Sequence, residues 1–279
     1  YIKIIYAGVI ATVAYNLIAS ILRALGDSKT PLYFLIISSV LNVILDLVFI
    51  INFNMGVAGA AYATIISQAV SAILCLIYTY KKFTILRLKR EDFNVKKRYY
   101  HKHLKIGIPM ALQFSITAIG IMTVQGALNV FGSTIIAAYT AASKALQLVM
   151  QPAITFGVTM ATYCGQNLGA KEYNRIKEGV KACTKISIIT SIIAGAVLIF
   201  LGKYFVMMFI SNPDVEILKY AQQVLDISAI FFIPLGLIFI YRNALQGIGD
   251  SFVPMMAGAY ELIARAIVAF TLPQYIGFF

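Results

Sequence analysis

The chain has 279 residues, of which 60% are hydrophobic and only 12% are charged, with a formal net charge of +12. A soluble domain usually carries about 25% charged residues, so the composition excludes a water-soluble globule and indicates a membrane protein. The three cysteines, Cys75, Cys164 and Cys183, are scattered without a metal-binding or redox spacing and are expected to be packing residues.

Long apolar segments follow one another along the whole chain. A helical span needs about 20 residues, and a barrel would show alternating segments of about 10 residues, which are not seen. The fold class predicted is therefore an all-α polytopic helical bundle with about eight spans. The chain begins at Tyr1 and ends within an apolar run, so we expect a fragment. The spans are expected at 4–25, 31–53, 57–80, 104–131, 135–164, 178–210, 217–246 and 253–279.

Loops rich in lysine and arginine alternate along the chain with loops that contain neither. Lysines and arginines gather after the first, third and fifth spans, whereas the connections "NFNMG", "FGST" and "SNPD" contain none. Such a bias marks cytoplasmic loops. The pattern predicts a multi-pass protein of the plasma (inner) membrane, with the loops near 23–29, 81–105, 165–185 and 246–252 in the cytoplasm.

The longest basic stretch, 81–103, separates three expected helices from five. It mixes charge with apolar residues such as Phe83 and Phe93, which favours a segment lying partly on lipid headgroups. Anionic lipid accounts for the charge, so no nucleic-acid partner is expected. The predicted organisation is a partial N-lobe at 1–80, the basic linker at 81–103 and a partial C-lobe at 104–279.

One short turn occurs twice. "LRALGDSKTP" begins at Leu22 and "LQGIGDSFVP" begins at Leu245, a displacement of 223 residues. Gly26 and Gly249 are expected to end a helix in the left-handed conformation, and Asp27 or Ser28 to cap the next helix. Six predicted helices separate the copies, so both lie on one side of the membrane. This predicts two parallel six-helix repeats, incomplete here, related by an axis along the membrane normal.

The strings "RALGDSKTP", "GVAGAAYATIISQ", "GIPMALQ", "YCGQNLGAKEYNR" and "RNALQGIGDS" occur in this order along the chain. Together they resemble the multidrug and toxic compound extrusion (MATE) transporters, from about the fourth to the eleventh of twelve helices. The resemblance implies export of amphipathic, often cationic compounds, driven by inward Na⁺ or H⁺.

Asn42 and Asp46 lie four residues apart in an otherwise apolar span and so share a helix face. A carboxylate within the membrane is a functional candidate because its burial is costly; the alternative is an Asp held by a helix N-terminus or a Ser. The resemblance implies that Asn42, Asp46 and Thr64 bind the coupling cation, and no other metal site or cofactor is expected. At the repeat-related positions stand Arg265 and Ala269, so we expect ion coupling in the first half.

The second half carries other charges within its spans. Glu261 and Arg265 are four apart and are expected to pair, while Arg242 lies near a helix end and can snorkel to the interface. Lys144 is expected near mid-membrane. Some branches of the family place acidic residues on the seventh and tenth helices, where this chain has Thr117 and Leu235.

Polar residues in the second half share helix faces in pairs and, with Lys144, Arg242, Glu261 and Arg265, form the predicted substrate cavity. The alternative is ordinary hydrogen bonding between helices. Pro152 and Pro234 are expected to interrupt long helices beside such a cavity. The pairs are Gln113 and Thr117, Gln125 and Asn129, and Gln147 and Gln151.

The predicted function is secondary active antiport of amphipathic or cationic compounds by alternating access, in a monomer. A lipid or lipid-linked oligosaccharide flippase is the alternative. The chain shows no Ser-His-Asp order, no histidine-rich metal motif and no phosphate-binding glycine loop, so no enzymatic activity is expected.

Overall fold

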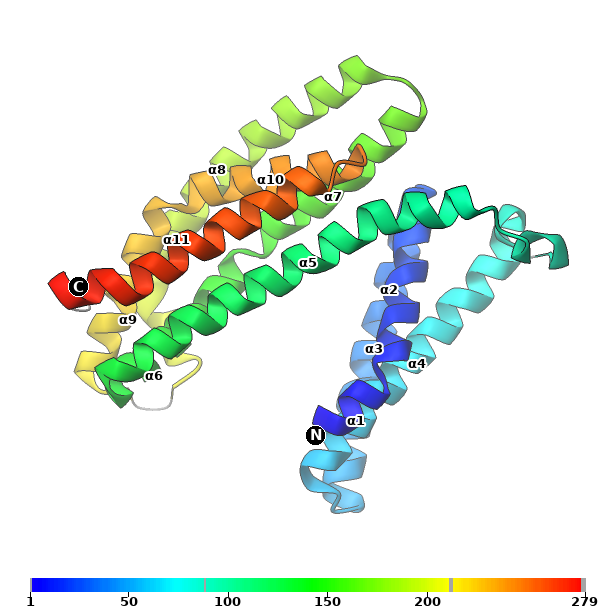
Figure 1. The fold of residues 1–279 in the computed structure, drawn as a ribbon. Helices are drawn as coiled ribbons and strands as arrows, with labels where there is room; N and C mark the ends of the chain where they lie inside the picture. The colour runs from blue at the N-terminus through cyan, green and yellow to red at the C-terminus, as the bar shows by residue number, and fades with distance from the viewer. Residues whose placement is uncertain (1, 88, 211–212, 277–279) are drawn as a thin grey trace. The chain divides into compact units, whose positions relative to one another are not determined.

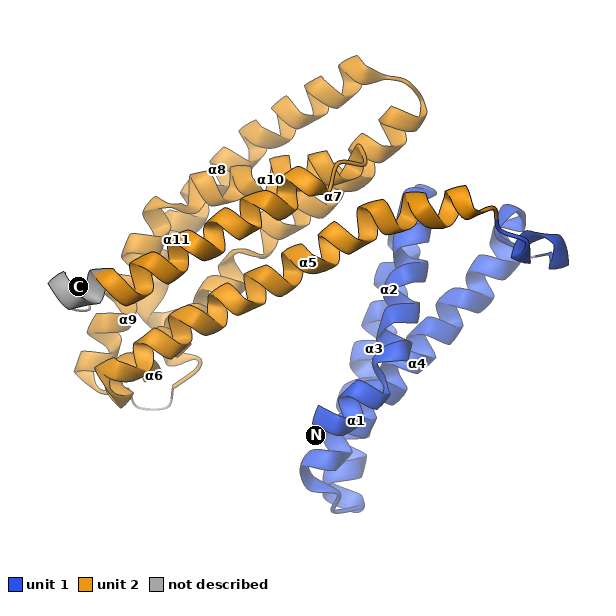
Figure 2. Ribbon diagram, viewed as in Figure 1, with its two compact units in different colours: residues 1–95 blue, residues 96–279 orange. Residues whose placement is uncertain are grey.

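The computed structural model describes residues 2–87, 89–210 and 213–276, with side chains described as far as Thr271. The chain separates into two compact units, residues 1–95 and 96–279 (Figure 2). The boundary lies within the expected linker. Every regular element among the described residues is a helix (Figure 1), which confirms the predicted all-α class.

Unit 1 consists of helices that pack around α4. Its elements are α1 (Ile2–Ala7), α2 (Val9–Ala24), α3 (Lys29–Leu47), the π-helix η1 (Val48–Asn52) and α4 (Gly56–Lys82). The single helix expected at 4–25 is broken at Gly8. A Cβ atom at Gly8 would lie 2.3 Å from the Ile65 side chain of α4, so the break occurs where the chain passes close against α4.

Small and hydroxyl side chains line the faces where α4 meets its neighbours. Ser38 of α3 donates a hydrogen bond to the carbonyl of Ser67 at 2.9 Å, and Ser71 donates to the carbonyl of Phe34 at 3.1 Å. Small residues let membrane helices approach closely, and hydroxyl groups join them. These contacts hold α3 and α4 side by side and antiparallel.

The basic linker is shorter than expected. It contains two 3₁₀ turns, η2 (Thr84–Leu86) and η3 (Arg90–Phe93), and α5 (Lys97–Leu128) already begins at Lys97 rather than near 104. Nothing in "KRYYHKHLK" breaks a helix: the segment contains neither Gly nor Pro. The helix therefore extends beyond the apolar run with its basic residues exposed.

Unit 2 contains the remaining helices, which pack in one pair and two groups joined by α8. α5 packs along α11, α7 packs against both α10 and α8, and α6 packs with α8 and α9. The elements after α5 are η4 (Asn129–Phe131), α6 (Ser133–Val149), α7 (Gln151–Gly169), α8 (Tyr173–Met207), α9 (Val215–Ile230), α10 (Phe232–Gly247) and α11 (Phe252–Ile276).

Two expected spans are interrupted, as the prolines predicted. The span 135–164 divides at Met150 into α6 and α7, and the span 217–246 divides at Phe231 into α9 and α10, which are bent by 56°. Pro152 and Pro234 lie in the first turn of the second helix of each pair. Proline there lacks an N–H that the new helix would leave unpaired in any case.

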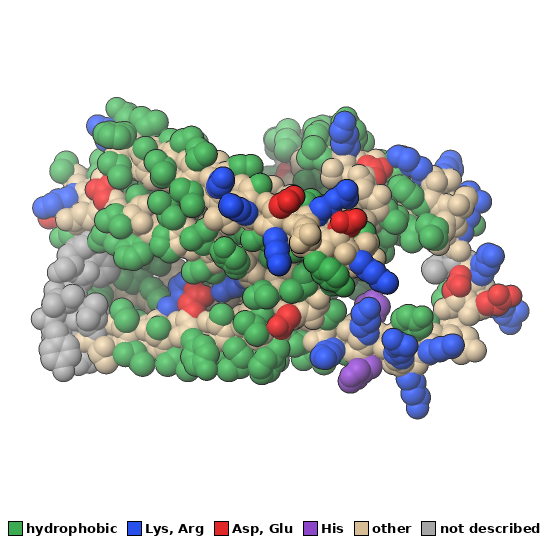
Figure 3. All heavy atoms as spheres, turned by 90° about the horizontal axis from the view of Figure 1, so that it is seen from above, with side chains coloured by type: hydrophobic (Ala, Val, Ile, Leu, Met, Phe, Trp, Pro, Cys, Tyr) green, Lys and Arg blue, Asp and Glu red, His purple; other side chains and the backbone are tan. Residues whose placement is uncertain are grey.

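Five of the described helices are long and apolar enough to cross a membrane, and six if the bent α9–α10 pair counts as one span. Eight were expected. The difference arises because the breaks at Gly8 and Met150 leave α2 and α6 with only 16 and 17 residues, while the 19-residue α7 is not apolar enough. Hydrophobic side chains cover much of the surface in view (Figure 3), as expected of a multi-pass membrane protein.

Both copies of the repeated turn have the same backbone hydrogen bonds. The N–H of Asp27 donates to the carbonyl of Leu22 at 2.9 Å, and that of Asp250 donates to the carbonyl of Leu245 at 3.0 Å. Gly26 and Gly249 have φ angles of 89° and 93°. These are Schellman caps with glycine in the left-handed conformation, which confirms the predicted turn.

Candidate functional site

The first candidate site lies on α3, one helical turn beyond its hydrogen bonds to α4. Phe34 of α3 is paired with Ser71 of α4. Four residues further along α3, Ser38 is paired with Ser67, which lies four residues earlier on α4. The next step places Asn42 level with Ala63 and Thr64. Asn42 and Thr64, predicted from distant parts of the sequence, therefore occupy one level of unit 1.

One more step places Asp46 level with Gly59. A Cβ atom at Gly59 would lie 3.0 Å from the Cβ of Phe49 and 3.1 Å from the Cβ of Met55. The backbone is therefore closely packed near Asp46, and the predicted coupling residues lie along the junction of α3 and α4. The hydroxyl of Thr64 donates to the carbonyl of Ala60 at 2.9 Å, and its oxygen can still accept a hydrogen bond or bind a cation.

Three polar atoms at this junction are shielded from solvent and lack a hydrogen-bond partner among the described residues. They are Asn42 Nδ2, Asp46 Oδ1 and Gln68 Oε1. Gln68 lies one turn from Thr64 on α4 and was missed in the sequence, where it reads as the end of an apolar helix string. Buried polar groups are normally paired. Asp46 Oδ1 and Gln68 Oε1 are acceptors, which can bind a proton donor or a cation, whereas Asn42 Nδ2 is a donor that needs an acceptor.

The helix geometry changes directly after Asp46. The α-helix ends at Leu47 and five residues, Val48–Asn52, continue as a π-helix. The N–H of Phe53 donates to the carbonyl of Val48 at 3.2 Å, an i to i−5 hydrogen bond. π-helical turns are rare and are frequent at functional sites, so this irregularity is an independent indication at the same place.

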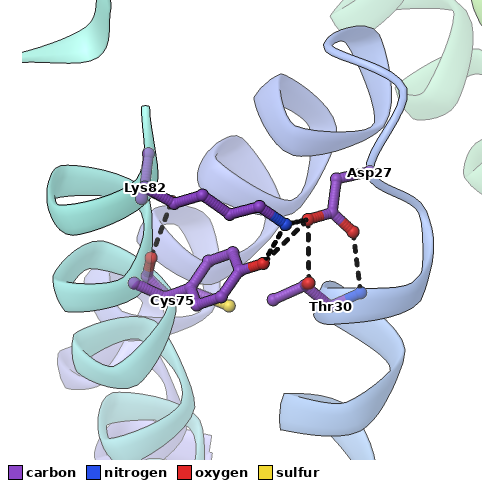
Figure 4. Close-up of polar contacts among 6 residues, drawn as sticks. Asp27, Thr30, Cys75 and Lys82 are labelled. Atoms are coloured by element: carbon purple, nitrogen blue, oxygen red, sulfur yellow. Dashed lines mark hydrogen bonds and ion pairs between the residues drawn. The ribbon is translucent and has the colours of Figure 1, made fainter. Parts of the chain in front are cut away.

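Asp27, in the first copy of the repeated turn, has a different role. Its carboxylate accepts hydrogen bonds from the N–H and the hydroxyl of Thr30, at 3.1 and 2.8 Å, and from Tyr78 and Lys82, each at 3.1 Å (Figure 4). Desolvation opposes ionisation, but these hydrogen bonds outweigh it and lower the pKa of Asp27 to about 2. Asp27 therefore caps α3 and ties it to the end of α4.

In unit 2, Gln113 is buried and bonded to a residue that the sequence did not single out. Gln246 Nε2 of α10 donates to Gln113 Oε1 of α5 at 2.8 Å, and the hydroxyl of Thr117 donates to the Gln113 carbonyl at 2.9 Å. The Gln113–Gln246 hydrogen bond joins α5 to α10, which is the alternative role given above for these polar residues.

The other predicted cavity residues are exposed in unit 2: Gln125, Asn129, Lys144, Gln147 and Gln151. Gln151 Nε2 donates to the carbonyl of Gln147 at 3.3 Å, within the break between α6 and α7. Lys144 lies with its Nζ 5.6 Å from the centre of the Phe209 ring. These residues are not joined to Gln113 by any hydrogen bond found among the described residues.

The remaining three predicted residues form one cluster between α10 and α11. Arg265 donates from Nε and a terminal nitrogen to Glu261 Oε1, at 3.0 and 2.6 Å. Arg242 donates to Glu261 Oε2 at 3.3 Å. The expected pairing of Glu261 with Arg265 is confirmed, whereas Arg242 does not snorkel but completes the cluster.

A further carboxylate within unit 2 was overlooked. Asp226 lies on α9, one turn before the break at Phe231, and its Oδ1 accepts a 2.7 Å hydrogen bond from Gln222. The expected span 217–246, which the resemblance aligned with the tenth family helix, therefore does carry an acidic residue, at a different position from Leu235. An isolated Asp in the string "QQVLDISAIFFIP" was a signal that could have found it.

The sequence profile of the MatE family matches residues 106–271, more than half of the chain. The chain belongs to the MatE family. A second profile, that of the lipid II flippase MurJ, matches residues 2–97. The MatE family consists of transporters, which agrees with the expectation that the chain is not an enzyme.

Curated relatives extend the MatE match across both units. "Probable multidrug resistance protein YpnP" of Bacillus subtilis is 32% identical and covers 89% of this chain and 55% of the relative. "Probable multidrug resistance protein NorM" of Thermotoga maritima is 25% identical over 99% of this chain and 60% of the relative. The chain thus spans little more than half the length of these relatives. Both relatives are named as multidrug resistance proteins, so the flippase alternative is not favoured.

Solved structures show the same fold. "Outward-facing conformation of a multidrug resistance MATE family transporter of the MOP superfamily" aligns with a TM-score of 0.91 at 21% identity. The alignment covers 99% of this chain and 62% of that one. The helical MatE fold therefore holds throughout the chain.

Proposed function

We propose that this MatE chain is part of a secondary active exporter of amphipathic compounds, including cations, in exchange for Na⁺ or H⁺. The protein is proposed to act as a monomer in the plasma membrane by alternating access. Its loops near 23–29, 81–105, 165–185 and 246–252 are proposed to face the cytoplasm, because they hold most of its lysines and arginines.

The proposal depends on one observation above all: Asp46 Oδ1 is shielded and has no partner among the described residues, on a helix long enough to span the membrane. A carboxylate there is costly unless it is neutralised. A proton or a Na⁺ ion supplies that neutralisation. For Na⁺, the oxygens of Asn42, Thr64 and Gln68 would add to the carboxylate the neutral oxygen ligands that hard cations prefer.

Ion movement provides the driving force. One elementary charge crossing the membrane releases about 2.3 kcal/mol per 100 mV. A site that alternately binds and releases one cation at Asp46 can therefore drive export, provided that empty and occupied states favour different conformations.

The test is Asp46→Asn in the full-length protein, reconstituted in vesicles with an imposed Na⁺ or H⁺ gradient. We expect ion-driven efflux of an amphipathic cation such as ethidium to be lost, with membrane insertion unchanged. Ser39→Ala is a matched control, because Ser39 is exposed on the same helix. Its one hydrogen bond among the described residues is to the carbonyl of Leu35, one turn earlier on α3. Unchanged efflux in Asp46→Asn would exclude the assignment.

The same vesicles separate the two ions and the alternative function. Efflux that follows the Na⁺ gradient at constant pH indicates Na⁺, and efflux that follows the pH gradient without Na⁺ indicates H⁺. Movement of a lipid-linked sugar without any efflux of ethidium would favour a flippase instead.

A further inference from the structure

The two repeats carry different charged groups on related helix faces. The 223-residue displacement between the repeated turns relates Asn42 of α3 to Arg265 of α11. The face of α3 that bears Asn42 also bears the carboxylate of Asp46, whereas the corresponding face of α11 bears a guanidinium. The duplicated scaffold therefore offers an acidic group in unit 1 and a basic group in unit 2.

In unit 2, one carboxylate is shared by two guanidinium groups. Arg265 and Arg242 bind different oxygens of Glu261, at 2.6 and 3.3 Å. Neither arginine forms another ion pair among the described residues. The cluster thus retains one net positive charge.

That charge lies within membrane-spanning helices. Glu261 is nine residues beyond Phe252, the first residue of α11, which corresponds to about 14 Å along the helix axis. Charged groups at such depth pair with one another or face a water-filled cavity. An excess of one guanidinium therefore calls for an additional anion.

Arg242 also has an unused hydrogen-bond donor. Its side chain is only 15% exposed, and its Nε is shielded from solvent without a partner among the described residues. A buried donor left unpaired costs about 1–3 kcal/mol, more when it is charged. The free donor and the excess charge belong to the same side chain.

Two members of the cluster are partly exposed within unit 2, and the cluster lies near the Gln113–Gln246 hydrogen bond. Glu261 and Arg265 are 37% and 41% exposed in unit 2. A Cβ atom at Gly120 of α5 would lie 3.2 Å from Cδ of Arg265, and one at Gly258 would lie 3.5 Å from Cγ of Gln113. The same faces of α5, α10 and α11 therefore hold the Gln113–Gln246 hydrogen bond and the arginine cluster.

We propose that Arg242 and Arg265 form a binding site for an anionic group, a carboxylate or a phosphate, on the transported compound. The planar guanidinium presents several N–H donors in a fixed fork that fits both anions. The incoming anion takes the free donor of Arg242 and competes with Glu261 for the two positive charges. The inference rests on the proposed export function and adds to its substrates compounds with an anionic group, including zwitterions.

The test is equilibrium binding to the full-length protein in lipid nanodiscs, without an ion gradient. Four probes share one ring system: 1-naphthylacetate, 1-naphthyl phosphate, the neutral 1-naphthylacetamide and (1-naphthylmethyl)trimethylammonium. We expect at least one of the two anions to bind more tightly than the amide. The stronger of the two identifies the preferred anion.

Substitutions assign the preference to the cluster. Arg242→Gln and Arg265→Gln are expected to weaken binding of the anion by at least about tenfold, the value of a charged hydrogen bond. Glu261→Gln should strengthen it, because the competing carboxylate is removed. Lys203→Gln makes the same charge change at an exposed site on α8, outside the predicted cavity, and should leave binding unchanged.

Several outcomes would overturn the proposal. Equal binding of all four probes, no binding of either anion, or insensitivity of anion binding to Arg265→Gln would each do so. Glu261→Gln provides a gain of binding that misfolding cannot mimic, should Arg242→Gln fail to fold. Asp46→Asn should keep the preference for the anion over the neutral amide, whereas Arg265→Gln should lose it. Failure of ion-driven efflux and failure of the anion site are therefore distinguishable.

Discussion

The two copies of the Leu-Gly-Asp-Ser-Pro turn agree in their backbone and differ in what surrounds it. Both end a helix with a left-handed glycine, and both have the same pair of closing hydrogen bonds. In the first copy, Asp27 binds Thr30, Tyr78 and Lys82. In the second, the only hydrogen bonds that Asp250 accepts from described residues come from the N–H groups of Phe252 and Val253.

The difference shows which part of a duplicated motif is local. Glycine, aspartate and proline determine the turn through backbone geometry, which needs no distant partner. In the first copy, Asp27 binds the hydroxyl of Thr30, where the second copy has Val253. Its bonds to α4 come from Tyr78 and Lys82. Conserving the turn therefore left the two repeats free to acquire different contacts.

The residue that ends each preceding helix provides the strongest test of this comparison. The first copy has Ala24, and the second has Gly247, where a Cβ atom would lie 2.4 Å from the carbonyl oxygen of Ala161 on α7. That neighbour is backbone and cannot rotate away. Gly247→Ala should therefore force α7 and α10 apart and cost about 3 kcal/mol, measured as the free energy of unfolding in mixed micelles.

Ala24→Gly is the matched change in the other direction. It creates no clash and should cost only about 1 kcal/mol through helix propensity. If Gly247→Ala cost no more than Ala24→Gly, the close contact of α7 and α10 would be wrong.

The two aspartates provide a second, smaller contrast. Asp27→Ala removes a helix cap worth about 1 kcal/mol and the side-chain bonds to Thr30, Tyr78 and Lys82, so we expect a total cost of about 2 kcal/mol. Asp250→Ala removes only a cap and should cost about 1 kcal/mol. Equal costs in the same unfolding measurement would show that the network at Asp27 adds nothing.

The pH dependence of stability tests the same network. The pKa of Asp27 lies at about 2, below its ordinary value of 3.8, so its ionised form stabilises the folded state above about pH 4. That contribution is lost as the pH falls through about 2. The difference in stability between the natural protein and Asp27→Asn should therefore be constant at neutral pH and shrink between about pH 4 and pH 2.

A third helix end has the same cap with an unsuitable residue. Lys171 has a φ of 62°, and the N–H of Glu172 donates to the carbonyl of Asn167 at 2.9 Å, as in the two repeated turns. Lys171→Gly should stabilise the protein by about 1 kcal/mol, because only glycine adopts this conformation without strain. Lys171→Ala removes the charge but keeps the Cβ atom and should give no such gain, when both are compared by thermal unfolding.

The candidate sites were predictable to different degrees. Asp46 could be found because a lone carboxylate is conspicuous in an apolar string, and the glutamate-arginine pair because of its four-residue spacing. Gln68 could not, since a glutamine in a helix gives no sign of whether its side chain is bonded. The role of Gln246 could not be predicted either, because only the tertiary structure brings it within hydrogen-bond distance of Gln113.

The sequence by itself determined the membrane class, the helical segments, the repeated turn and the breaks near Pro152 and Pro234. Each of these follows from hydropathy or from the backbone preferences of single residues, which act over one or two helical turns. Only the tertiary structure decided that Arg242 joins Glu261 and Arg265, and that Asn42 and Asp46 each keep an atom without a partner in the part of the chain that the structure describes. Whether a polar atom finds a partner depends on the register and separation of neighbouring helices, and no local preference fixes these.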